Sequence, residues 1–105
     1  MSSSSDSFVV ELAGDLTLRS IADAHLQLSQ ALTEHPSVTV APEPGVAVDL
    51  TFVQLVESAR RTAQATGKSF AMAAPATGPL LETLQRGGFL SSPEHRGFWL
   101  FEKDL

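Results

Sequence analysis

The sequence predicts a single α/β domain, in which a mixed sheet of about four or five strands packs against about three helices. Extended apolar runs alternate with segments of helical periodicity along the chain, and this alternation is typical of α/β proteins. A chain of 105 residues is long enough for one hydrophobic core. We therefore expect residues 8–105 to form one domain, preceded by a disordered, serine-rich tail over residues 1–7.

The chain begins with extended segments. Residues 8–12, Phe-Val-Val-Glu-Leu, have the composition of a strand, and the following Gly14-Asp15 is typical of a turn. Residues 16–18, Leu-Thr-Leu, favour a short second strand.

A helix is expected over residues 20–34. Ser20 and Asp23 have the spacing of a capping box, and His35-Pro36 ends the helix. One face of this helix carries a stripe at helical spacing, made of Ile21, His25, Leu28 and Leu32.

The centre of the chain favours two short strands, over residues 38–40 and 46–48. Between them, residues 41–45 contain two prolines and a glycine, which exclude regular structure.

A second helix is expected over residues 52–66. Thr51 and Gln54 have capping-box spacing, with Thr51 as the N-cap, and Leu50 and Leu55 occupy the positions of a hydrophobic staple. Its buried stripe comprises Phe52, Leu55, Val56, Ala59 and Ala63.

The last third of the chain repeats the alternation of strand and helix. Residues 69–73 favour a strand, Thr77 can cap a short helix over residues 78–86, and Gly87-Gly88 ends that helix. The apolar run Phe98-Trp-Leu-Phe101 favours a final strand.

Composition excludes several classes of function. Seven Lys and Arg residues against twelve Asp and Glu give a net charge of −5, so binding to nucleic acid or to an anionic membrane is not expected. The chain has no cysteine and no apolar run of the ~20 residues that a membrane span needs. Residues 1–7 lack the features of a signal peptide, so we expect a cytoplasmic protein.

No motif in the chain indicates catalysis. The three histidines, His25, His35 and His95, lie in separate segments without the spacing of a metal site. The chain contains no G-x-S-x-G, Walker A or G-x-G-x-x-G motif, and nothing local supports a Ser-His-Asp triad. We therefore expect no catalytic residue, no metal and no cofactor, which makes the chain a non-enzyme.

An ordered set of short motifs runs through the second half of the chain: Val48-Asp49, Gln54-Leu55, Ala59-Arg60-Arg61 and Gly67-Lys68. In order and spacing, this set resembles the STAS family, the domain of bacterial anti-sigma-factor antagonists and of anion-transporter tails. The resemblance extends upstream to Leu12-Ala-Gly-Asp-Leu-Thr-Leu18, which is similar to the family's opening hairpin. Downstream it includes residues 74–90, so it covers roughly residues 8 to 102. It implies a STAS-like fold.

Some positions depart from the family's pattern. The phosphorylatable serine of the family directly follows the aspartate, and here Leu50 follows Asp49. The family's glycine two positions further on is replaced by Phe52, and its Asp-Leu-Ser before the aspartate by the proline-rich residues 41–45. The usual serine switch is therefore not expected. Thr51 is the nearest hydroxyl that could accept a phosphate, and its alternative role is that of the helix cap.

The resemblance implies a signalling module that binds a protein partner and performs no catalysis. The implied partner is a kinase or anti-sigma factor with a histidine-kinase-type ATPase fold, or a two-component regulator. The alternative is a STAS accessory subunit of an ABC-type lipid transport system, bound to its ATPase. Homodimer formation stays open, and so does nucleotide binding, for which the chain has no phosphate loop.

We expect the partner-binding surface at the end of the sheet where loops follow strands, because open sheets bind ligands there. The candidate residues are Asp15, Asp49, Leu50, Thr51, Phe52 and Thr77. The two aspartates would complement a basic patch on the partner. Phe52 would be an aromatic anchor if it is exposed, and otherwise the first core residue of its helix.

Overall fold

A computed structural model describes residues 7–102 of the chain. The elements, in chain order, are β1 (Phe8–Leu12), α1 (Ile21–Glu34), β2 (Ser37–Pro42), α2 (Leu50–Ala65), β3 (Ser69–Met72), α3 (Gly78–Arg86) and α4 (Pro93–Leu100). The chain is thus of the α/β class, as the sequence predicts. Apart from Ser7, the expected tail over residues 1–7 lies outside the described residues.

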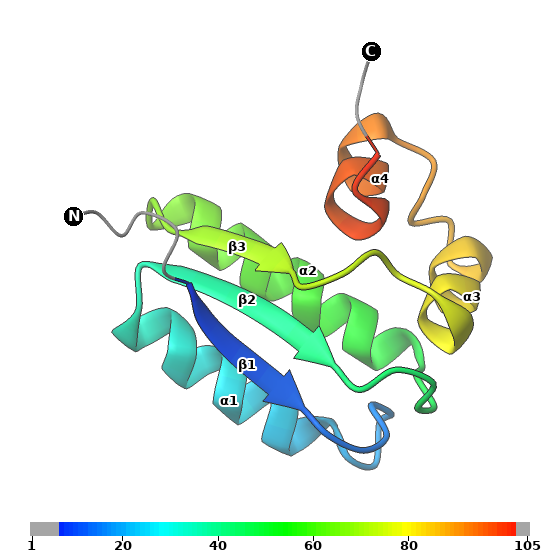
Figure 1. The fold of residues 1–105 in the computed structure, drawn as a ribbon, viewed down its shortest axis with the longest axis horizontal. Helices are drawn as coiled ribbons and strands as arrows, with labels where there is room; N and C mark the ends of the chain where they lie inside the picture. The colour runs from blue at the N-terminus through cyan, green and yellow to red at the C-terminus, as the bar shows by residue number, and fades with distance from the viewer. Residues whose placement is uncertain (1–6, 103–105) are drawn as a thin grey trace.

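The sheet contains β1, β2 and β3 in chain order, and both strand pairs are parallel. Figure 1 shows α1 and α2 behind the sheet, while no helix crosses the face turned to the viewer. Burial follows this arrangement, because Val10, Val40 and Met72 share one row and are buried, whereas Val9 in the next row is 47% exposed. The helices therefore cover one face of the sheet and leave the other open.

A mixed sheet of four or five strands is not confirmed. Within residues 7–102 the sheet has three strands, and the expected strands at 16–18 and 46–48 contribute a single parallel bridge between Leu16 and Val48. The prolines and glycine before Val46 interrupt the ladder there, and Leu18 is 71% exposed. These segments are loops joined at one point.

The expected strand over residues 98–101 is wrong, because Phe98 to Leu100 form the last turn of α4. Ser92 caps this helix by accepting a hydrogen bond from the His95 backbone N–H, and Pro93 takes the first helical position. A short apolar run does not distinguish a strand from a buried helical turn by periodicity. The Ser-Pro-Glu sequence before the run was the signal for a helix start.

The helices α1 and α3 begin and end within one residue of the expected positions. The capping box of α1 does not form, because Ser20 makes no side-chain cap bond and its hydroxyl donates to the Asp15 carbonyl at 2.6 Å. The N-cap of α2 is Asp49, two residues before the expected Thr51. Leu50 consequently becomes a 42% exposed first residue of the helix, and no staple with Leu55 is formed.

A continuous core lies between the sheet and the helices, and it includes Trp99 of α4. Its largest fully buried side chains are Trp99, Phe52, Leu28 and Leu84, followed by the valines 38, 40, 53 and 56. Of the expected stripe on α2, Leu55 is only half-buried, and Val53 replaces it in the core. Among the described residues, no helix combines the length and the apolar character required to cross a membrane.

Candidate functional site

An apolar hollow of about 270 Å³ opens at the carboxyl ends of β2 and β3. We call it the carboxyl-end hollow. It is lined by residues 41–46 and 72–77 together with Val48, Pro79 and Leu80. Glu43 is the only charged residue among the described residues that line it. Parallel sheets place their binding sites at this end, because the loops that follow the strands meet there.

Three carboxylates are fixed by backbone N–H groups on the loops next to this hollow. Asp15 accepts from the N–H of Ala47 at 3.1 Å, and Glu43 accepts from the N–H of Gly14 at 2.8 Å. Asp49 accepts from the N–H of Leu18 at 2.9 Å. Within residues 7–102 none of these carboxylates forms an ion pair. This end of the sheet therefore carries negative charge that a cationic partner can neutralise.

Asp49 also caps α2. Its Oδ1 accepts from the Thr51 N–H at 3.0 Å and from the Thr51 hydroxyl. The hydroxyl hydrogen bond is the main cause that lowers the pKa of Asp49 below its ordinary value of 3.8. Burial opposes this shift, and the backbone N–H groups of Leu18, Thr51 and Phe52 lower the pKa further. The Thr51 hydroxyl therefore serves the cap, although it is not the cap residue itself.

Five of the six expected binding residues are at least partly exposed at the same end of the molecule. Asp15 and Asp49 belong to the loops tied together next to the carboxyl-end hollow. Thr51 lies in the first turn of α2, bonded to Asp49, and exposed Thr77 lines the hollow. Leu50 is exposed at the start of α2. Phe52 has no exposed surface, so of its two expected roles it takes that of a core residue. It therefore provides no aromatic anchor on the surface.

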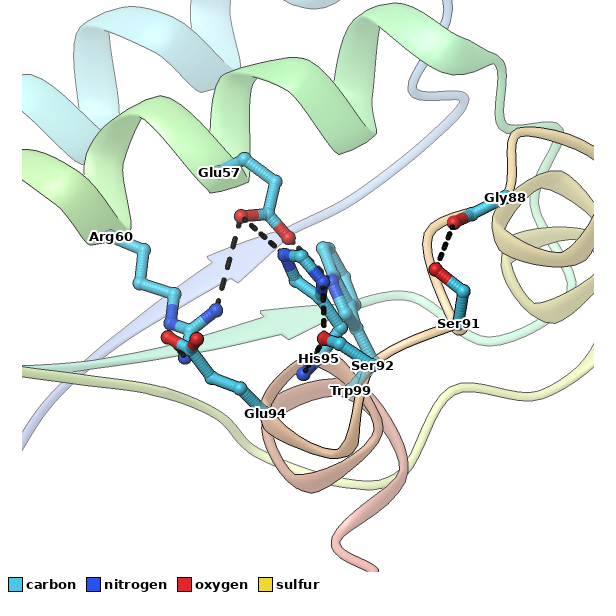
Figure 2. A network of polar contacts seen from close by, with 8 residues as sticks. All are labelled: Glu57, Arg60, Gly88, Ser91, Ser92, Glu94, His95 and Trp99. Carbon is cyan, nitrogen blue, oxygen red and sulfur yellow. Dashed lines mark hydrogen bonds and ion pairs between the residues drawn. The ribbon is translucent and has the colours of Figure 1, made fainter.

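A second polar cluster joins α4 to α2 and was not expected from the sequence (Figure 2). We call it the docking cluster. At its centre is Glu57, which is 7% exposed and accepts from the indole Nε1 of Trp99 at 2.9 Å. The other carboxylate oxygen lies 3.7 Å from His95 Nε2 and 3.9 Å from Arg60, which in turn pairs with Glu94 at 3.0 Å. Glu57 follows Val53 by four residues, and this spacing on the buried side of α2 was the available signal.

The arrangement in space of a serine, a histidine and a glutamate in this cluster resembles a hydrolase triad. Ser92 Oγ lies 2.9 Å from His95 Nδ1, and Glu57 lies on the other side of the His95 ring. The geometry nevertheless suits docking better than catalysis. The Ser92 oxygen already accepts from the His95 N–H as the cap of α4, and 3.7 Å between His95 and Glu57 exceeds a hydrogen bond. Glu57 also holds the Trp99 indole. The cluster therefore fixes α4 on α2.

The residue types that commonly ligate metals are spread over the described part of the chain. Within residues 7–102, no group of three or more His, Cys, Asp or Glu side chains is arranged to hold a metal ion. His25, His35 and His95 lie on α1, at its C-cap and on α4, respectively. The ring of His35 stacks on that of Phe8 at 3.9 Å between centroids, and His95 belongs to the docking cluster.

Comparisons of the chain with models of known protein families, with curated proteins and with solved structures find no match.

Proposed function

We propose that this chain is a non-catalytic protein-interaction module that binds its partner at the carboxyl-end hollow. The observation that carries the proposal is the combination of an apolar concavity with three carboxylates fixed next to it. A partner segment that places an apolar side chain in the hollow, flanked by Lys or Arg, would satisfy both features. The carboxylates are held by backbone N–H groups, so little side-chain entropy is lost on binding.

The class of partner comes from the resemblance to the STAS family and is part of the proposal. By that resemblance the chain acts in bacterial cytoplasmic signal transduction, and its partner is a histidine-kinase-type kinase, an anti-sigma factor or a two-component regulator. The finer STAS architecture, with a mixed sheet of four or five strands, belongs to the same proposal.

The interaction is proposed to lack the serine-phosphorylation switch. Leu50 stands directly after Asp49, and the nearest hydroxyl, that of Thr51, donates to the Asp49 carboxylate. A phosphate on Thr51 would stand against that carboxylate, so like-charge repulsion opposes it. This supports a module that binds constitutively.

The partner class can be tested by expressing the tagged chain in its native host and identifying the co-purified proteins by mass spectrometry. A kinase, an anti-sigma factor or a response regulator supports the proposal. A permease and its ATPase would support the accessory subunit of a lipid transporter. Recovery of neither class would contradict both.

The binding surface can be tested by replacing each of two exposed alanines with lysine. Ala74 is exposed and lines the hollow, whereas Ala65 is exposed at the end of α2. Ala74→Lys should abolish co-purification of the partner, because the lysine side chain occupies the hollow expected to receive an apolar side chain and repels the cations expected beside it. Ala65→Lys makes the same change of charge and should retain the partner. Equal retention by both variants would reject this surface.

A further inference from the structure

β1 forms one edge of the sheet. This edge offers a second surface that does not depend on the proposed function. Leu12 accepts at its carbonyl from the N–H of Glu43, so Leu12 faces β2. The N–H and C=O of one residue in a parallel strand point to the same side, and successive residues alternate. Val9 and Glu11 therefore direct their backbone N–H and C=O groups away from the sheet.

A groove of about 250 Å³ lies beside this edge, between β1 and α1. We call it the β1 groove. Residues 8–11 of β1 form one wall, and Gln27, Gln30, Ala31 and Glu34 of α1 line the other. Figure 1 shows α1 running along β1, with no further strand at that edge of the drawn sheet. An unpaired strand edge next to a helix is the arrangement that accepts an added strand.

Charge decides which strand fits. Glu11 and Glu34 are exposed and are the charged residues among those that line the groove. A strand added beside β1 alternates its side chains between the open face, near Glu11, and the α1 side, near Glu34. A second copy of this chain would bring Glu11 and Glu34 of each copy into one seam. The described residues that line the groove include no cation, so like charges there are destabilising.

We propose that the β1 groove binds an extended segment of a partner protein that carries Lys or Arg and pairs with β1 as a fourth strand. The backbone groups of Val9 and Glu11 supply the hydrogen bonds of the new ladder. Glu11 and Glu34 select for cationic side chains on the two faces of the added strand. Recognition of this kind draws affinity from the main chain and specificity from alternate side chains.

The probe is a short acetylated peptide in which pairs of lysines alternate with pairs of valines, so that both faces of the added strand carry lysine. It is added to the full chain at moderate salt. Amide hydrogen exchange by NMR should show new protection at Val9 and Glu11. Methylation of alternate peptide nitrogens, on the side that faces β1, should remove the binding, because it deletes the donors of the ladder while the charge is unchanged. Binding of the methylated peptide with equal affinity would overturn the proposal.

Variants of the chain provide the second arm. Val9→Pro removes an outward N–H that the β1–β2 pair does not use, and it should weaken peptide binding by roughly tenfold or more while circular dichroism stays unchanged. Glu34→Lys should weaken binding about two- to fivefold. Glu82→Lys makes an equal change of charge at an exposed side chain of α3 and should have less effect. Should Val9→Pro fail to fold, the methylated peptide and the Glu34→Lys pair still decide the question.

Three results would reject the proposal: no peptide binding, binding without protection at Val9 and Glu11, or equal effects of Glu34→Lys and Glu82→Lys. A dimer of the chain alone that Val9→Pro dissociates would also reject it, since the edge would then belong to a second copy. If the Ala74→Lys variant loses its co-purified partner but still binds the peptide, the β1 groove and the carboxyl-end hollow are two independent binding surfaces.

Discussion

The indole of Trp99 donates a 2.9 Å hydrogen bond to the buried carboxylate of Glu57, and the two residues are 42 positions apart in the chain. This bond connects α4 to the central helix α2 inside the core. The other carboxylate oxygen of Glu57 faces Arg60 and His95, so the buried charge has partners on both oxygens. A buried charge is tolerated only when it is paired or hydrogen-bonded in this way.

Removing the indole donor should destabilise the chain. In Trp99→Phe, one oxygen of Glu57 loses its partner in the core, and an unsatisfied buried acceptor costs about 1–3 kcal/mol in addition to the lost volume. Urea denaturation followed by far-UV circular dichroism measures the change. Glu57→Leu removes the acceptor, so this substitution and Trp99→Phe together should show a coupling of about 0.5–3 kcal/mol. Strict additivity would contradict a direct interaction.

Asp49 should make the stability of the chain depend on pH in the acid range. Hydrogen bonds to its charged form lower its pKa in the folded state below the ordinary 3.8. Its contribution is therefore complete above that value and is lost as the pH falls through the folded pKa. Asp49→Ala should cost about 0.5–2 kcal/mol at neutral pH, as loss of an N-cap does. The difference from the wild type should shrink below pH 3.8 in acid titrations of unfolding.

Asp15→Ala is the matched control, because this carboxylate accepts one backbone N–H and caps no helix. It should cost less than Asp49→Ala at neutral pH. Replacing both Asp15 and Asp49 with lysine is a poor test of partner binding, because loss of the Asp49 cap would reduce the stability of the chain as well as binding. A larger effect at Asp15 than at Asp49 would contradict the assignment of the cap.

Thr51 should remain unphosphorylated when the chain meets its cognate kinase. Its hydroxyl donates to the Asp49 carboxylate, so a phosphate would lose this hydrogen bond and face a like charge. Phosphopeptide mapping after incubation with the kinase is the measurement, and the peptide that spans residues 49–55 contains no other hydroxyl. Stoichiometric phosphothreonine there would restore a switch and overturn constitutive binding.

The core of α2 should depend on Phe52 more than on Leu55. Phe52 has no exposed surface, so Phe52→Ala should lower the free energy of unfolding by about 3–5 kcal/mol. Leu55 is only half-buried at the margin of the core, so Leu55→Ala should cost less than the ~2–5 kcal/mol of a fully buried leucine. Chemical denaturation of both variants compares them, and the reverse order would contradict the orientation of α2.

Patterns confined to one segment were predicted well from the sequence. The stop at His35-Pro36 and the bounds of α3 depend on local residues, and both are confirmed. The extent of the sheet depends on whether an extended segment pairs with a neighbouring strand, which the segment's own sequence does not show. Residues 16–18 and 46–48 pair with each other at one bridge only. The candidate binding residues lie at one end of the sheet, as expected, because turns after parallel strands converge there. The Glu57–Trp99 bond needed the fold, since the sequence does not show which helix α4 meets.

Trp99 is the single tryptophan of the chain, and it lies in the interface between α4 and α2 rather than in the sheet. Its intrinsic fluorescence therefore reports the docking of α4, whereas far-UV circular dichroism reports all the helices and strands. If the domain unfolds in one cooperative step, the two signals change at the same denaturant concentration. An earlier fluorescence transition would instead reveal a partly unfolded species in which α4 has detached from α2 while the rest of the domain stays folded.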